Sequence, residues 1–121
     1  MAAAAAGATR RMTTLSTHVL DLSRGVPAAG MAVRLCAGER VLHDDLTDAD
    51  GRCPALRALT LAAGTYRLEF AVADYFRGQG VALPEPPFLE VVPIVFGMTA
   101  AGHYHVPLLV SPFGYSTYRG S

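Results

Sequence analysis

Lysine is absent from this sequence of 121 residues, and all ten of its basic residues are arginine. Ten acidic residues bring the formal net charge to zero, and no basic run stands out. The chain therefore lacks the electrostatic footprint of a nucleic-acid-binding protein. No apolar run approaches the length of a membrane-spanning helix. We expect neither nucleic acid nor a membrane as a partner.

Cysteine is scarce, and Cys36 and Cys53 do not have the spacing of a metal site. Each fits a small buried hydrophobic position in a reducing compartment, although a disulfide between them stays open. At the N-terminus, alanines precede Arg10 and Arg11, which reverses the order of a secretory signal. We predict a disordered Ala-rich tail over residues 1–12 and one globular domain over 13–121.

Turn residues divide the domain into short segments with strand patterns, which favours an all-β fold. The clearest segment is Thr65–Ala73, where alternation places Tyr66, Leu68 and Phe70 on one face. Pro93 interrupts another segment and predicts an edge strand or a bulge, because proline cannot donate to the ladder. The predicted strands are 13–21, 31–36, 41–47, 65–73, 88–97, 103–111 and 115–118. Such a set indicates a sandwich or a barrel.

Two further segments have a different character. Asp74–Gly80 predicts a short helix with Asp74 as its N-cap. Leu56–Ala63 is rich in alanine and leucine, so that helix and strand both fit it. Helix is therefore expected over no more than a small part of the chain.

The four histidines are the first candidates for chemistry. His103 and His105 are two residues apart on one predicted strand, so their side chains share a face. His18 lies on another strand, and His43 is expected to be a solvated bystander. Free imidazole titrates near pH 6.5 and can accept a proton at neutral pH. Three interpretations remain open: hydrogen-bonded structural histidines, zinc ligands, and general bases without a metal.

Arg52 and the C-terminal segment are the other candidates. Arg52 directly follows a predicted turn at residues 48–51. It is either a solvated charge or a group that binds an oxyanion or an anionic substrate. The segment Tyr118–Ser121 follows an apolar strand. It either frays, as chain ends usually do, or brings a hydroxyl, a guanidinium and a carboxylate together.

Three segments taken together resemble the 5-hydroxyisourate hydrolase family. They are LSTHVLD at residues 15–21, HYHVPLL at residues 103–109 and YSTYRGS at residues 115–121. Asp50–Arg52 is similar to the turn that presents the active-site arginine of that family. The resemblance extends from Leu15 to Ser121. Transthyretin, the hormone carrier, shares the fold but lacks this set of histidines and this ending.

The resemblance implies an all-β, transthyretin-like (prealbumin-like) sandwich of seven to eight strands with one short helix. It also implies a homotetramer, built as a dimer of dimers, with sites at the dimer–dimer interface. Its implied activity is hydrolysis of 5-hydroxyisourate to 2-oxo-4-hydroxy-4-carboxy-5-ureidoimidazoline in urate degradation, without cofactor or metal. A cytoplasmic location is expected rather than a peroxisomal one. The alternative function is a transthyretin-like small-ligand-binding module without catalysis.

The same resemblance assigns the site residue by residue. The catalytic residues would be His18, Arg52, His105 and Ser121, and the substrate-binding residues would be His103, Tyr118, Arg119 and Gly120. Which histidine is the general base stays open at this point.

Overall fold

Alternation of apolar and polar residues builds most of the strands. In a computed structural model, which describes residues 12–120, buried side chains alternate with more exposed ones in most of the strands, whereas residues 40–46 and 114–117 have no buried side chain. The elements in chain order are β1 (Thr13–Ser16), β2 (Val19–Asp21), β3 (Val26–Pro27), β4 (Ala32–Ala37), β5 (Arg40–Leu46), α2 (Pro54–Arg57), β6 (Gly64–Ala71), α3 (Val72–Gly78), β7 (Val91–Met98), β8 (Gly102–His105), β9 (Leu108–Ser111) and β10 (Gly114–Thr117).

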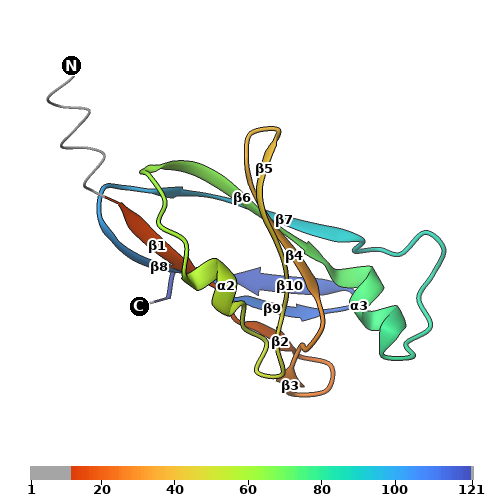
Figure 1. Ribbon diagram of the computed structural model, residues 1–121. Coiled ribbons are helices and arrows are strands. Elements are labelled where there is room, and N and C mark those ends of the chain that lie inside the picture. The colour runs from red at the N-terminus through yellow and green to blue at the C-terminus, as the bar shows by residue number, and fades with distance from the viewer. Residues whose placement is uncertain (1–11, 121) are drawn as a thin grey trace, which may run out of the picture.

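Two four-stranded sheets form a sandwich, with strand orders β5-β4-β6-β7 and β10-β9-β2-β3 (Figure 1). Their facing side chains share one core, to which Leu35 and Phe70 contribute from one sheet and Val19 and Leu108 from the other. Each is at most 1% exposed. Burying a side chain of this kind contributes roughly 1.5–3 kcal/mol. The predicted all-β sandwich is therefore confirmed.

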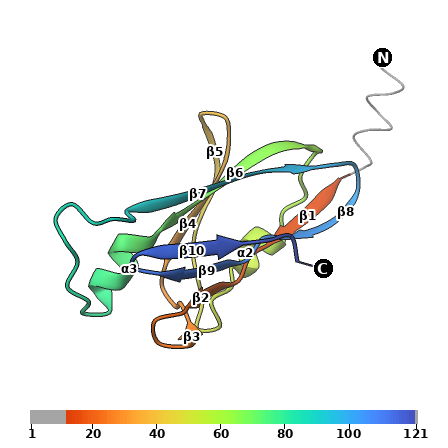
Figure 2. The ribbon, with the colours of Figure 1, turned by 180° about the vertical axis from the view of Figure 1, so that it is seen from behind.

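The predicted first strand and the predicted strand 103–111 are each split in two. β1 and β8 pair in parallel as a separate two-stranded sheet, and β2 and β9 pair in parallel within the second large sheet. Figure 2 shows the β1-β8 pair leading into the β2-β9 pair. The segments that carry the histidines, far apart in sequence, thus lie side by side.

The helix prediction was wrong in number and in boundary. The described residues contain two short helices, because Pro54–Arg57 forms α2 at the start of the ambiguous apolar segment. Proline at the first position of a helix loses no hydrogen bond, which explains this start. α3 begins at Val72, two residues before the predicted cap, so Asp74 lies in its first turn instead of at its N-cap.

The remaining predictions of structure can be compared directly. β7, which contains Pro93, lies at the edge of its sheet, as predicted. Cys36 and Cys53 are free and buried, so the disulfide left open from the sequence does not form. His43 is half-buried and 2.9 Å from Asp45 Oδ2 instead of free in solvent. None of the helices within residues 12–120 has the length and apolar character needed to cross a membrane. The predicted tail lies outside the described residues, apart from Met12.

Asp21 holds the turn after β2 against α3. Its side chain accepts hydrogen bonds from the Ser23 hydroxyl, from Arg24 and from Tyr75 Oη, the last at 2.8 Å. Burial by itself would raise the pKa of Asp21, but these donors outweigh it and lower the pKa below its ordinary value. This part of the LSTHVLD motif is therefore structural, and it fixes β2 just after His18.

Candidate functional site

The parallel pairing of β1 with β8 brings two hydroxyls to two imidazoles. The register places Thr14 opposite His103 and Ser16 opposite His105. Thr14 Oγ1 lies 2.7 Å from His103 Nδ1. Ser16 Oγ lies 2.8 Å from His103 Nε2 and 2.7 Å from His105 Nδ1. The four side chains form one continuous hydrogen-bonded row on the half-buried face of the pair.

His18 lies where the strand pairing changes, between β1 and β2. Val106 donates its N–H to Ser16 O at 2.9 Å, and Leu108 donates to His18 O at 3.0 Å. Thr17 Oγ1 occupies the interruption and donates to Val106 O at 2.7 Å. The predicted position of His18 in mid-strand was therefore wrong, and its backbone lies at a break in the ladder.

Arg52 is presented by a turn whose geometry depends on Asp48 and Gly51. Asp48 Oδ1 accepts the N–H groups of Asp50 and Arg52 at 2.9 and 3.0 Å. Gly51 has a φ of +77°, and a Cβ there would collide with the carbonyl oxygen of Val19. Glycine is therefore required by conformation and by space. The turn pairs Arg52 with His18 in an isolated antiparallel bridge.

The C-terminal segment returns to the same place. Gly120 donates its N–H to His105 O at 2.7 Å. Thr117 Oγ1 donates to Pro107 O at 2.7 Å, and the Arg119 guanidinium lies 4.1 Å from the centre of the Tyr104 ring. A cation in this position is attracted by the face of the aromatic ring. Three separate contacts thus hold residues 117–120 against β8 and its continuation.

The two central imidazoles are held towards their neutral form. The pKa of His105 is lowered by burial first, and then by the charges of Arg52, His18 and His103. The pKa of His103 is lowered by burial and by the charge of Arg57. A neutral imidazole is the form that can accept a proton. The surroundings of both rings therefore favour the basic form at neutral pH.

Two hollows flank this row of imidazoles. One has a volume of about 290 Å³, and its lining includes Ser16, Arg52 and Arg57. The other has a volume of about 550 Å³ and is lined by His103, Tyr118, Arg119 and Gly120. Because Ser16 and His103 are hydrogen-bonded to each other, the two hollows adjoin. A small polar substrate in the second hollow would contact the imidazole of His103 and the guanidinium of Arg119, whereas the first hollow offers the guanidinium groups of Arg52 and Arg57.

Seven of the eight site residues named from the sequence lie in this region. They are His18, Arg52, His103, His105, Tyr118, Arg119 and Gly120. Ser121, the eighth, lies outside the described residues. Sequence reasoning missed Thr14, Ser16 and Arg57. The signal for the first two was present, because Thr14, Ser16 and His18 alternate with the buried residues Thr13, Leu15 and Thr17.

The zinc interpretation meets an obstacle at His103. Both of its ring nitrogens are within hydrogen-bond distance of hydroxyls, and His105 Nδ1 is similarly engaged. Ligation by His103 would require one of these bonds to break. Within residues 12–120, no group of three histidine, cysteine or acidic side chains is placed to hold a metal ion.

Gly120 allows the C-terminal segment to approach His105, and its substitution gives a first prediction. A Cβ at position 120 would lie 2.5 Å from His105 Cδ2. Gly120→Ala must therefore displace the ring or the segment. Misplacement of a reacting group by about 1 Å can cost roughly 100-fold in rate. We expect Gly120→Ala to lower kcat/KM of the hydrolysis implied by the family resemblance about 10- to 100-fold, with little change in melting temperature.

A matched glycine provides the control for this prediction. At Gly78, in α3, an added Cβ would meet nothing within 4 Å. Gly78→Ala should therefore leave the kinetics unchanged. Equal losses in the two variants would show that the effect is not specific to His105.

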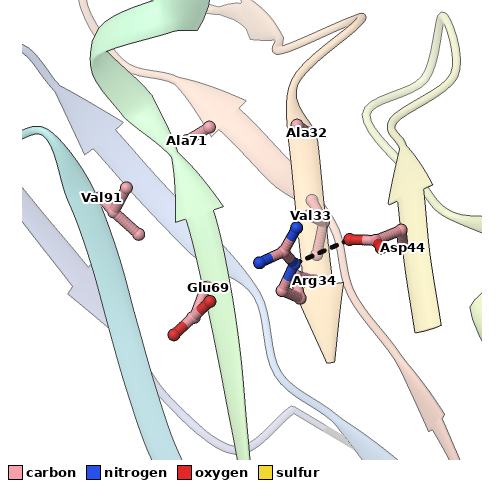
Figure 3. Close-up of a pocket in the computed structure, with 7 residues that line it drawn as sticks. All are labelled: Ala32, Val33, Arg34, Asp44, Glu69, Ala71 and Val91. Carbon is pink, nitrogen blue, oxygen red and sulfur yellow. Dashed lines mark hydrogen bonds and ion pairs between the residues drawn. The ribbon is translucent and has the colours of Figure 1, made fainter. Parts of the chain in front are cut away.

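Another hollow, of about 230 Å³, lies on the outer face of the β5-β4-β6-β7 sheet (Figure 3). Figure 3 shows the Arg34 guanidinium directed at Asp44 across β4 and β5, with a distance of 2.8 Å. Both side chains are more than half exposed, and such pairs contribute about 0–1 kcal/mol. Because no histidine lines this hollow, it does not offer the chemistry found at the row of imidazoles.

Comparisons with known proteins agree with this geometry. A sequence profile described as the HIUase/Transthyretin family matches residues 15–120. A 5-hydroxyisourate hydrolase of Mesorhizobium japonicum is 58% identical over 113 residues, which cover 88% of this chain and 91% of that protein. The structure of Klebsiella pneumoniae 5-hydroxyisourate hydrolase matches with a TM-score of 0.79 and 38% identity, covering 90% of this chain and 94% of that one.

A structure of (S)-allantoin synthase matches with a TM-score of 0.82 and 38% identity. The match covers 91% of this chain but 44% of the synthase chain, so the likeness concerns one part of that larger protein. These structural matches and the profile confirm the transthyretin-like fold predicted from the sequence.

Proposed function

The chain belongs to the HIUase/Transthyretin family, and on this premise we propose that it hydrolyses 5-hydroxyisourate to 2-oxo-4-hydroxy-4-carboxy-5-ureidoimidazoline. The observation that carries the proposal is the convergence of His18, His105 and Arg52. The pKa of His105 is shifted by the charges of both other residues. A neutral imidazole that accepts a proton and a guanidinium that stabilises an oxyanion suit the hydrolysis of a cyclic amide.

The reaction has three tasks, and the proposed residues divide them. A water oxygen attacks a ring carbonyl carbon and gives a proton to an imidazole. We assign this base to His105. Its Nδ1 is occupied by Ser16, which leaves Nε2 for the water. Arg52 orients the substrate and stabilises the developing oxyanion. The C–N bond then breaks, and the leaving nitrogen takes a proton from the imidazolium.

The C-terminal segment completes the proposed site. Tyr118 and Arg119 line the hollow beside His103, and Gly120 fastens the segment to His105. We assign these residues and His103 to substrate binding, and Ser121 to holding the water or substrate through its hydroxyl.

A homotetramer, built as a dimer of dimers, is part of the proposal. The edge strands β7 and β10 both leave one side unpaired within the described chain. Near these edges Val91, Val95, Phe113, Tyr115 and Tyr118 are exposed, each by at least 44%. Exposed apolar side chains beside a free sheet edge are typical of a surface that a second subunit covers.

A direct assay tests the activity. 5-Hydroxyisourate is generated from urate with urate oxidase, and its absorbance is followed with and without this protein. We expect decay much faster than the spontaneous rate, with the activity retained after dialysis against a chelator. A decay rate equal to that without protein would contradict catalysis and favour the small-ligand-binding alternative.

A further inference from the structure

The hydrogen bonds of Ser16 connect two imidazoles through a single hydroxyl. This hydroxyl has one hydrogen to donate and two lone pairs with which to accept. It lies 2.7 Å from His105 Nδ1 and 2.8 Å from His103 Nε2. If one ring donates to Ser16, the hydroxyl hydrogen is free to serve the other ring. Both contacts and the hydroxyl hydrogen are satisfied when one ring donates and the other accepts. If both rings donated to the two lone pairs, the hydroxyl hydrogen would have no acceptor within residues 12–120.

This constraint couples the tautomers of the two rings. When His105 carries its proton on Nδ1 and donates to Ser16, the hydroxyl donates to Nε2 of His103. His103 then carries its proton on Nδ1, which donates to Thr14 Oγ1 at 2.7 Å. The reverse arrangement places both protons on Nε2. The two rings therefore carry their protons on the same nitrogen, and Ser16 sets them together.

We propose that Ser16 is a positioning residue that couples the tautomer of His105 to that of His103 through the row Thr14–His103–Ser16–His105. Of the two coupled arrangements, the proposed reaction uses the one in which Nε2 of His105 is bare. The inference rests on the proposed function, since the bare Nε2 is the atom that takes the proton from water. Without the hydroxyl, nothing else in the row would fix which nitrogen of His105 is protonated. The pair would behave as two independent rings.

The row of hydrogen bonds also allows the positive charge that comes with the proton taken from water to lie on His103 instead of on His105. After Nε2 of His105 takes a proton from water, its Nδ1 proton passes to Ser16 while the Ser16 proton passes to His103 Nε2. His105 becomes neutral and His103 becomes the cation, with its Nδ1 proton still directed at Thr14. The charge is then one ring farther from Arg52 and nearer Arg57, which are the charges facing the two rings together with His18. The reverse transfer returns the proton for the leaving nitrogen.

Nitrogen NMR of the free protein tests the coupling without reference to activity. Histidine labelled with ¹⁵N in its ring reports which nitrogen carries the proton. In the wild type at pH 7.5 we expect both His103 and His105 to carry it on Nδ1. In Ser16→Ala we expect His105 to become a mixture of tautomers, and in Ser16→Thr to return to Nδ1. Opposite tautomers in the wild type, or an Nε2 proton on His105, would overturn the proposal.

Kinetics tests the consequence for catalysis. A general base contributes about 10²–10⁴-fold. We expect Ser16→Ala to lower kcat by at least about 10-fold, as a part of that contribution, with KM changed less than about 2-fold, and Ser16→Thr to recover most of the loss. Ser111→Ala is the matched control, because Ser111 Oγ makes a 3.4 Å contact with Gly114 O in a different sheet from Ser16.

The two experiments separate this proposal from the proposed function. An inactive wild type with coupled tautomers would contradict the function and leave the coupling intact. An active wild type in which Ser16→Ala keeps its kcat within about 2-fold would contradict the role of Ser16 alone. The NMR spectrum of Ser16→Ala also reports whether that variant is folded.

Discussion

Replacement of His105 by alanine is expected to lower kcat/KM for 5-hydroxyisourate by about 10²–10⁴-fold, the usual contribution of a general base. His105 is half-buried, its Nδ1 is held by Ser16, and its backbone carbonyl accepts the N–H of Gly120. Alanine keeps that backbone bond, so the C-terminal segment can remain in place. The loss would then report the imidazole and not the fold.

The pH dependence of kcat/KM provides a further test of His105 as the general base. A neutral base loses activity when it is protonated, so kcat/KM must fall as pH falls through the pKa of His105. Burial, Arg52, His18 and His103 all lower that pKa. The wild type should therefore keep its activity to a pH below the ordinary imidazole value of about 6.5. His105→Ala should lose this acid limb together with the activity.

A second histidine serves as the control. His43 lies on β5 and is paired with Asp45, in a sheet that does not contain the row of imidazoles. His43→Ala is expected to retain wild-type kinetics and the wild-type acid limb. If His105→Ala also kept its kcat/KM within about 10-fold, the base would have to be assigned to His18 instead.

The strands could be predicted because their patterns are local. β6 alternates Tyr66, Leu68 and Phe70 on its buried face, and Pro93 marked β7 as an edge strand. The break between β1 and β2 could not be seen, because residues 13–21 contain neither glycine nor proline. At this break the Thr17 hydroxyl donates to Val106 O, which is 89 residues away in the sequence. Predicting a break of this kind requires knowledge of which strands pair with each other.

The candidate site likewise consists of features that could be predicted from the sequence and features that could not. The shared face of His103 and His105 followed from their spacing alone. The approach of β1 to β8 did not, because parallel partners are chosen by the whole fold and not by local pattern. Resemblance to a family supplied His18 and Arg52, whereas Ser16 and Thr14 were passed over because isolated hydroxyls carry little signal. Their role appears only when the register places each opposite a histidine.

Replacement of Arg52 by alanine should cost catalysis roughly 10²–10³-fold, or about 3–4 kcal/mol, as for removal of a fixed oxyanion donor. Arg52 is exposed and follows a turn whose hydrogen bonds involve backbone groups and Asp48, so the fold should be retained. Arg52→Lys keeps the charge but not the planar fork of donors, and we expect it to recover only part of the rate.

Arg52→Ala should also change a second, independently measurable quantity, the pH dependence of kcat/KM. The charge of Arg52 helps to lower the pKa of His105, so its removal must raise that pKa and move the acid limb of kcat/KM to higher pH. Arg34→Ala, on the outer face of the β5-β4-β6-β7 sheet, should change neither the rate nor the position of the acid limb of kcat/KM. Arg57→Ala should act on His103, whose pKa its charge lowers, and leave most of the rate intact. If Arg57→Ala matched Arg52→Ala in both measurements, the two arginines would act through their summed charge, and the specific role of Arg52 as oxyanion donor would be lost.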